Sequence, residues 1–140
     1  GIPIVKDRVV QQAFRQIIEP IFEKDFSDNS FGFRPKRCCH DAIRRLEQYK
    51  KEGYIKVVDA DIQAFYDTIP QKLILDRLRE KISDGWVLNS IDNMLKAGVM
   101  EDGILHKTTK GTPQGGVISP LLANLVGDVI DKPLTLDSVT

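Results

Sequence analysis

The 140-residue sequence has few cysteines and no long hydrophobic run. Its two cysteines, Cys38 and Cys39, are adjacent, and His40 follows them without the ligand spacing of a zinc site. The pair also makes no disulfide framework, so we expect a reducing, cytoplasmic location. No apolar run approaches the roughly 20 residues that a membrane-spanning helix needs, and residues 1–6 lack the layout of a signal peptide. We therefore expect no contact with a membrane.

The chain also has no net charge, because its 20 lysines and arginines balance its 20 aspartates and glutamates. The two parts of the chain differ, however. Residues 1–52 carry 11 basic and 8 acidic side chains (+3), whereas residues 53–140 carry 9 and 12 (−3). A basic first part suits a polyanion and an acidic second part suits a metal ion. An ordinary surface of mixed charges explains the same counts.

Helical periodicity covers most of the chain. Apolar residues recur at helical spacing in five segments, which we expect to be helices: 7–24, 38–52, 70–82, 86–96 and 119–129. A β-hairpin is expected within 98–109, where short apolar pairs flank good turn residues. The first helix should contribute seven side chains to the hydrophobic core: Val10, Ala13, Phe14, Ile17, Ile18, Ile21 and Phe22. We also expect Trp86 in the core.

A short strand is expected at residues 56–62, where β-branched residues accompany two aspartates. Side chains alternate along a strand, so Asp59 and Asp61 would point the same way. A carboxylate at the end of a strand suits a hard cation such as Mg²⁺, and a pair of these ions is the usual device for in-line phosphoryl transfer. The alternative is that Asp61 only caps the following turn while Asp59 is solvated.

Basic residues gather between positions 34 and 51. Arg37, Arg44 and Lys51 are spaced at two helical turns, which places them on one side of a helix. Phe31 and Phe33 lie nearby in the sequence, and a basic stripe beside aromatic rings is typical of binding to a phosphate backbone. A solvated helix face explains the same spacing without any ligand.

Four stretches carry recognisable motifs. Residues 2–13 contain Ile-Pro and then Lys-Asp-Arg-Val-Val-Gln-Gln-Ala, and residues 31–37 read Phe-Gly-Phe-Arg-Pro-Lys-Arg. Residues 61–67 read Asp-Ile-Gln-Ala-Phe-Tyr-Asp, and residues 112–116 read Thr-Pro-Gln-Gly-Gly. In this order and spacing they resemble the reverse transcriptases of group II introns. The third stretch is similar to the family's first catalytic motif and the fourth to its Pro-Gln-Gly loop.

The resemblance implies an α+β fold, in which fingers helices pack on a small antiparallel palm sheet of a right-hand polymerase. Residues 1–52 would be the fingers region, and residues 53–140 would be part of the palm with fingers-side helices. The family's second catalytic motif, Tyr-Ala-Asp-Asp, has no counterpart before Thr140. We therefore interpret the chain as an incomplete part of a longer polymerase, and we expect that it does not extend primers alone.

The resemblance also implies a reaction, RNA-directed DNA synthesis by nucleotidyl transfer with Mg²⁺. On an RNA template, the 3′-hydroxyl of a DNA primer would attack the α-phosphate of a deoxynucleoside triphosphate. Asp61 would be the first catalytic, metal-binding carboxylate, and the Ile62 carbonyl would help to hold the ion.

Other residues would contact the nucleotide and the template. Tyr66 would lie under the incoming sugar as a steric gate against a 2′-hydroxyl, and Phe65 could touch the nucleotide; core packing is the alternative for both rings. Gln114 would touch the nucleotide or the template, and Gly115 would let the backbone approach closely. The residues expected to meet template or triphosphate phosphates are Lys6, Arg8, Arg34, Arg37 and Arg44.

Two alternative functions remain. Group II intron proteins also act as maturases, which grip intron RNA to assist splicing, so the chain could be an RNA-binding module without DNA synthesis. The basic region from Arg34 to Lys51 supports this alternative. The other is a related palm polymerase such as a retron or RNA-copying enzyme, against which the Phe-Arg-Pro and Gln-Gly-Gly motifs argue.

Overall fold

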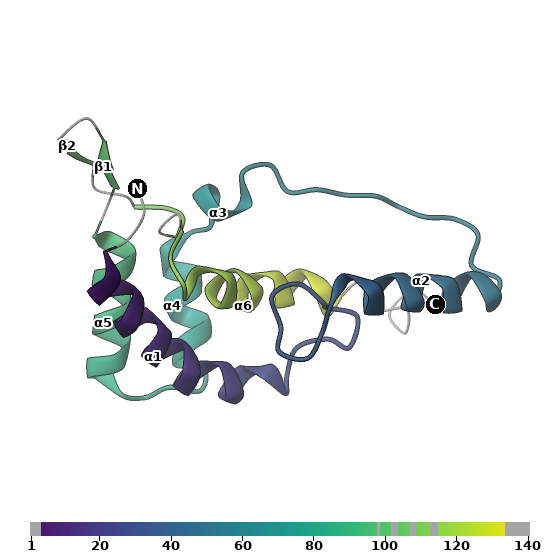
Figure 1. The fold of residues 1–140 in the computed structure, drawn as a ribbon, viewed down its shortest axis with the longest axis horizontal. Helices are drawn as coiled ribbons and strands as arrows, with labels where there is room; N and C mark the ends of the chain where they lie inside the picture. Colours follow the sequence, from purple (N-terminus) through teal and green to yellow (C-terminus); the bar gives the residue numbers. More distant parts are fainter. Residues whose placement is uncertain (1–3, 98, 102–103, 107–108, 113–114, 134–140) are drawn as a thin grey trace.

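A computed structural model describes residues 4–97, 99–101, 104–106, 109–112 and 115–133, and helices dominate it (Figure 1). The predicted helices are present with shifted boundaries, and the predicted hairpin is present as two antiparallel strands. No helix among the described residues has the length and apolar character needed to cross a membrane. The elements are α1 (Val5–Glu23), α2 (Cys39–Lys51), α3 (Phe65–Thr68), α4 (Gln71–Arg79), α5 (Gly85–Lys96), β1 (Val99–Glu101), β2 (Ile104–His106) and α6 (Ser119–Asp131).

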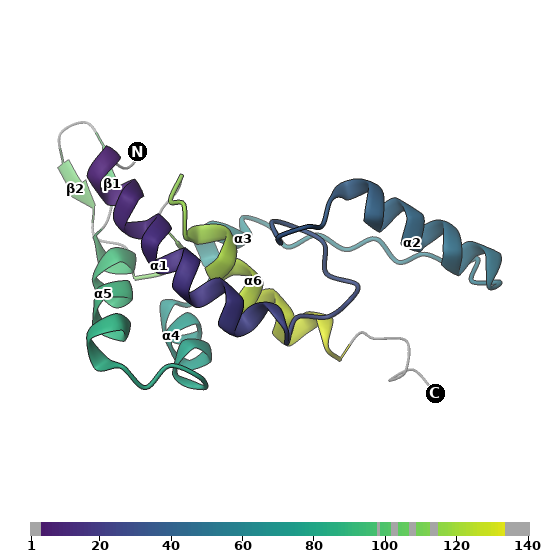
Figure 2. The same ribbon diagram turned by 60° about the horizontal axis from the view of Figure 1, so that its bottom comes forward.

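The hydrophobic core lies where α1, α4, α5 and α6 meet at one end of the molecule (Figures 1 and 2). Each of these helices contributes apolar side chains from one face, as their periodicity predicts. Burying one such side chain contributes about 1.5–3 kcal/mol, so this cluster is the main source of stability. Its most deeply buried members include Ile18, Phe22, Ile74, Leu78, Ile91, Leu95, Leu122 and Leu125.

The prediction for the core was wrong on part of α1. Ile18 and Phe22 are buried, but Ile17 is 69% exposed, and Val10 and Ala13 are exposed too. Trp86 is 72% exposed and stacks on Phe14 with ring centroids 5.8 Å apart. Periodicity shows which face of a helix is apolar, but it does not show how much of that face a neighbouring element covers.

Helix α2 lies apart from the core, at the other end of the molecule (Figures 1 and 2). Within the part of the chain that the structure describes, none of its side chains is buried. Its apolar edge is exposed at Ile43 and Leu46. A long connection, residues 52–64, returns from α2 to α3 (Figure 1).

The expected α+β fold with a palm sheet is wrong for this structure. Residues 54–62 form no strand, and the sheet among the described residues is limited to the β1–β2 hairpin. A strand needs a neighbour to pair with its N–H and C=O groups, and no described segment pairs with residues 55–62. Val57 and Val58 are accordingly 81% and 91% exposed, despite their strong strand propensity.

Candidate functional site

The start of the Pro-Gln-Gly loop lies directly against the end of the first catalytic motif. The Gly111 amide donates a hydrogen bond to the Ile69 carbonyl (2.7 Å). The Thr112 amide donates to the Tyr66 carbonyl (2.8 Å). Two stretches that lie more than forty positions apart in the sequence therefore share one backbone joint.

Gly111 is required at this joint. Its φ of +77° is in the left-handed region, and a Cβ at this position would lie 2.7 Å from the Tyr66 carbonyl oxygen and 2.9 Å from Asp67 Cα. Glycine alone among the amino acids combines this conformation with such a close approach. The sequence indicated a role for Gly115 but not for Gly111, although Gly111 stands beside the matched motif.

Two buried glutamines hold the loop from opposite sides. The Gln71 amide of α4 donates to the Gly111 carbonyl (3.2 Å) and to the Leu95 carbonyl of α5 (3.0 Å). Gln11 of α1 accepts a hydrogen bond from the Val117 amide (2.8 Å). Because buried polar groups are costly unless they are paired, these bonds fix the loop relative to three helices. Sequence reasoning assigned neither residue a role.

Tyr66 and Phe65 both pack half-buried against the hydrophobic core, with ring centroids 6.1 Å apart in an edge-to-face arrangement. Burial raises the pKa of the Tyr66 hydroxyl still further above neutrality than its ordinary value. The backbone of Tyr66 is held by the hydrogen bond from Thr112, and its ring packs against the core. This placement is compatible with either role expected from the sequence, core packing or contact with a nucleotide.

Asp61 lies in the exposed connection that precedes α3, and so do Asp59 and Ile62. Ala64, with a left-handed φ of 49°, turns the chain from this connection into α3. Among the described residues no group of three or more potential ligands could hold a metal ion. Mg²⁺ requires near-octahedral oxygen coordination, so these residues alone do not fit it, and Asp61 stays a prediction for one ligand. Gln114 lies outside the described residues, and Gly115 is exposed with φ +75°.

Arg34 is the most enclosed of the predicted phosphate contacts, since its side chain is only 3% exposed. Its guanidinium donates to the Glu23 carboxylate (2.8 Å) and to the carbonyls of Ser27 (2.6 Å) and Ser30 (2.9 Å). It also lies over the Phe26 ring. In this arrangement the donors of Arg34 hold the loop between α1 and α2 in place.

The remaining predicted phosphate contacts fall into two groups. Arg37 pairs with Asp28 (2.9 Å) and Arg44 pairs with Asp41 (2.5 Å), beside a surface hollow of about 310 Å³ that Asp28, Asp41 and Arg44 help to line. Lys6 and Arg8 are exposed in the first turns of α1, at the opposite end of the molecule (Figure 1). The structure therefore does not gather all five basic residues into one site.

Comparison with known proteins points to one family. Residues 1–139 match the family described as reverse transcriptase (RNA-dependent DNA polymerase). The chain is 38% identical over 138 residues to Protein YkfC of Escherichia coli (strain K12), covering 96% of this chain and 36% of that protein. It is 41% identical over 132 residues to the group II intron-encoded protein LtrA of Lactococcus lactis subsp. cremoris, covering 94% and 22%. Nuclear intron maturase 1, mitochondrial, of Arabidopsis thaliana is 35% identical over 94 residues, covering 67% and 13%.

The chain spans about a third of the length of the first of these relatives and about a fifth of the second. The family match, in contrast, extends over nearly the whole chain. The similarity to proteins named for group II introns and intron maturation agrees with the motifs in the sequence. The chain therefore belongs to the reverse transcriptase (RNA-dependent DNA polymerase) family, and its resemblance to the group II intron members is confirmed.

Proposed function

We propose that this chain supplies the fingers and part of the palm of an RNA-directed DNA polymerase of the group II intron type. The fingers would be residues 1–52 and the partial palm residues 53–140. Membership of the family supports the reaction class. The backbone joint between the two motifs is the observation that supports particular residues. It brings the Pro-Gln-Gly loop and the stretch that contains Asp61 and Tyr66 into one site.

In this proposal the joint sets the position of the Tyr66 ring. The Thr112 amide fixes the Tyr66 carbonyl, while the core packs against one side of the ring. A fixed ring under the incoming sugar would exclude a 2′-hydroxyl by steric overlap, which favours deoxynucleoside triphosphates. Gln114 and Gly115, which follow Thr112 in the sequence, would contact the nucleotide or the template strand.

Asp61, five positions before Tyr66, would act as a carboxylate ligand of Mg²⁺ with the Ile62 carbonyl beside it. Both residues are solvent-exposed and belong to the connection that enters α3. Reverse transcriptases generally use this ion. Because the described residues do not complete its coordination, the remaining ligands would have to come from groups outside them.

The test is sugar discrimination by a longer polypeptide that includes this chain, measured as primer extension on an RNA template with deoxy- or ribonucleotides. Tyr66→Val, which removes the ring, should raise the relative use of ribonucleotides by about tenfold or more, because a steric exclusion is lost. Tyr66→Phe keeps the ring and should discriminate as the unaltered protein does. Unchanged discrimination by Tyr66→Val would contradict the assigned role.

A maturase-type RNA-binding module is the second function, and the placement of α2 favours it. This helix projects from the core (Figure 2). Its Arg44 lines the hollow together with Asp28, the ion-pair partner of Arg37. Under this alternative the chain would bind structured intron RNA with an affinity that falls steeply with salt, because phosphate contacts release counterions. Filter binding at several salt concentrations measures this. An affinity that does not change with salt would exclude it.

A further inference from the structure

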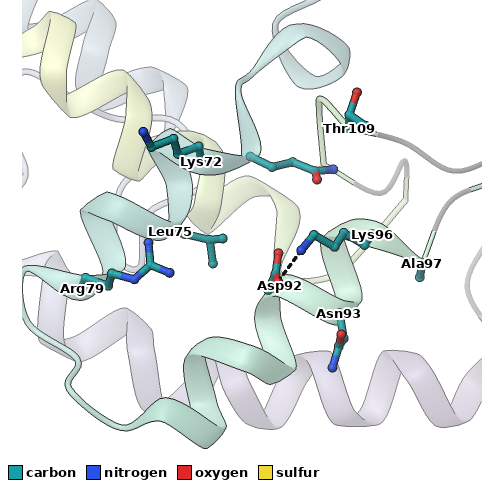
Figure 3. Close-up of a pocket in the computed structure, with 9 residues that line it drawn as sticks. Lys72, Leu75, Arg79, Asp92, Asn93, Lys96, Ala97 and Thr109 are labelled. Carbon is teal, nitrogen blue, oxygen red and sulfur yellow. Dashed lines mark hydrogen bonds and ion pairs between the residues drawn. The ribbon is translucent and has the colours of Figure 1, made fainter.

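A pocket of about 730 Å³ lies between α4 and α5 (Figure 3). None of the residues that the resemblance assigned to metal, nucleotide or template lines it. Its volume falls within the range of about 300–1,000 Å³ that is usual for ligand sites. The lining residues that matter for its chemistry are Lys72, Leu75, Arg79, Asp92, Asn93 and Lys96.

The pocket is positively charged, in a part of the sequence that is acidic overall. Lys72, Arg79 and Lys96 contribute +3 and Asp92 contributes −1, which leaves +2. Lys72 and Arg79 stand on one face of α4, on either side of Leu75, because they are seven positions apart. Lys96 enters from α5, and Figure 3 shows Arg79 and Lys96 on opposite sides of Leu75.

These cations remain available to a ligand. Lys72 makes no ion pair or side-chain hydrogen bond among the described residues. Arg79 pairs with Asp76 (3.0 Å) and Lys96 with Asp92 (2.6 Å), but the two cations are largely exposed. The Arg79–Asp76 pair is exposed at both ends, and such a pair is typically worth no more than about 1 kcal/mol, so a doubly charged anion can compete for Arg79. Asp92 is only 24% exposed, so Lys96 would meet an anion while it stays paired with Asp92.

The walls of the pocket are firmly held. Ile74 and Leu78 are fully buried on the face of α4 opposite its cations, and they anchor this helix in the core. Ile91 and Leu95 are buried in the same way and anchor α5. The hydrogen bond from the Gln71 amide to the Leu95 carbonyl joins the start of α4 to the end of α5. A ligand would therefore meet a preformed surface, which lowers the cost of binding.

We propose that this pocket binds a phosphate-bearing ligand. Lys72 and Arg79 are about 10 Å apart along the helix axis, which suits more than one phosphate group. The arginine offers a planar pair of donors and the lysines offer point charges, and both are usual partners of phosphate. The two sources of such a ligand are the backbone of an RNA strand and a free polyphosphate. The inference rests on the pocket alone and is independent of the proposed polymerase function.

The test compares Lys72→Gln and Arg79→Gln with Lys24→Gln, which removes the same charge at an exposed position after α1. Binding of a fluorescein-labelled RNA hairpin is followed by anisotropy over a series of KCl concentrations, and binding of pyrophosphate is followed by calorimetry. Each pocket variant should weaken binding of one probe about three- to tenfold. For RNA, it should also reduce the slope of log affinity against log salt by about one.

The two probes distinguish the sources of the phosphate. Weaker RNA binding with unchanged pyrophosphate binding identifies an RNA backbone, and the reverse identifies a free polyphosphate. Thermal melts should agree among the three variants, because all three positions are exposed. If both pocket variants bind both probes as Lys24→Gln does, the pocket is not a phosphate site.

Discussion

At the scale of single residues, two positions hold separate parts of the chain together: Gly111 in the joint between the two motifs, and Arg34 in the loop between α1 and α2. Gly111 fits against Tyr66 and Asp67 only because it has no Cβ. Arg34 holds its loop only because its guanidinium has enough donors for one carboxylate and two carbonyls at once. Both positions can be tested by substitutions that have a matched control elsewhere in the chain.

Gly111→Ala should destabilise the chain by about 2–4 kcal/mol, because it adds a left-handed alanine and a steric clash with the backbone. Gly127→Ala is the control. Gly127 lies within α6, where an added Cβ meets no atom within 4 Å. That change should stabilise the chain by about 0.5–1 kcal/mol, as helix propensity predicts. Urea denaturation of the two variants measures both effects, and a Gly111→Ala variant as stable as the unaltered chain would refute the close contact.

Arg34→Gln should cost about 2–3 kcal/mol. The loss leaves the Glu23 carboxylate without its donor, whereas the Ser27 and Ser30 carbonyls keep donors from the Ser30 amide and from Arg37. The figure is reduced from that of a fully buried pair because Glu23 is partly exposed. Arg79→Gln, which breaks an exposed pair with Asp76, should change the free energy of unfolding by less than about 1 kcal/mol. Equal effects of the two substitutions in chemical denaturation would show that Arg34 does not hold the loop.

At the scale of elements, α2 and α4 show what periodicity predicts and what it does not. The buried face of α4 was predicted correctly, at Ile74, Leu75 and Leu78, because its neighbours α5 and α6 cover it. The apolar edge of α2 was also visible in the sequence, yet no described element covers it. Helix α2 therefore depends on interactions at its N-terminus and on the hydrogen bonds of Arg45 and Tyr49 with Asn29 of the preceding loop.

The N-terminus of α2 should be sensitive to acid. Hydrogen bonds from Arg44 and from Cys38 lower the pKa of Asp41 from 3.8 to about 2. Since the folded pKa lies below the unfolded one, the stabilisation is present above pH 3.8 and is lost as the pH falls through about 2. Amide chemical shifts of α2 should report this loss of helix, and Asp41→Asn should lack α2 stabilisation already at neutral pH.

Glu47→Gln is the matched control for this experiment, because it removes a carboxylate from the same helix without touching the cap. It should leave the acid transition of α2 in place. An Asp41→Asn chain whose α2 keeps the acid transition would show that another group causes it.

At the scale of the whole molecule, the sequence predicted the helices and the hairpin more reliably than the sheet. Residues 56–62 have strand propensity, but a strand forms only beside another strand, and no described segment pairs with this one. The roles of Gln11 and Gln71 were not predictable either. A glutamine in an amphipathic helix gives no sign that its amide will be buried against a loop from elsewhere in the chain.

We propose that the 140-residue chain binds RNA without extending a primer, because the one carboxylate assigned to the metal, Asp61, cannot complete the coordination of Mg²⁺ by itself. Primer extension on an RNA template, with a longer polypeptide that includes the chain as positive control, measures this. Extension by the purified chain that disappears in Asp61→Asn would show that the chain itself completes the site.

The most direct test of the central claim, that Asp61 belongs to a polymerase site, compares Asp61→Asn with Asp59→Asn in such a longer polypeptide. Both aspartates are exposed in the same connection, so the two substitutions are alike in charge and in surroundings. If Asp61 is a catalytic metal ligand, Asp61→Asn should reduce primer extension by more than about 100-fold, whereas Asp59→Asn should retain most of it. Primer extension by Asp61→Asn at the rate of Asp59→Asn would contradict the claim.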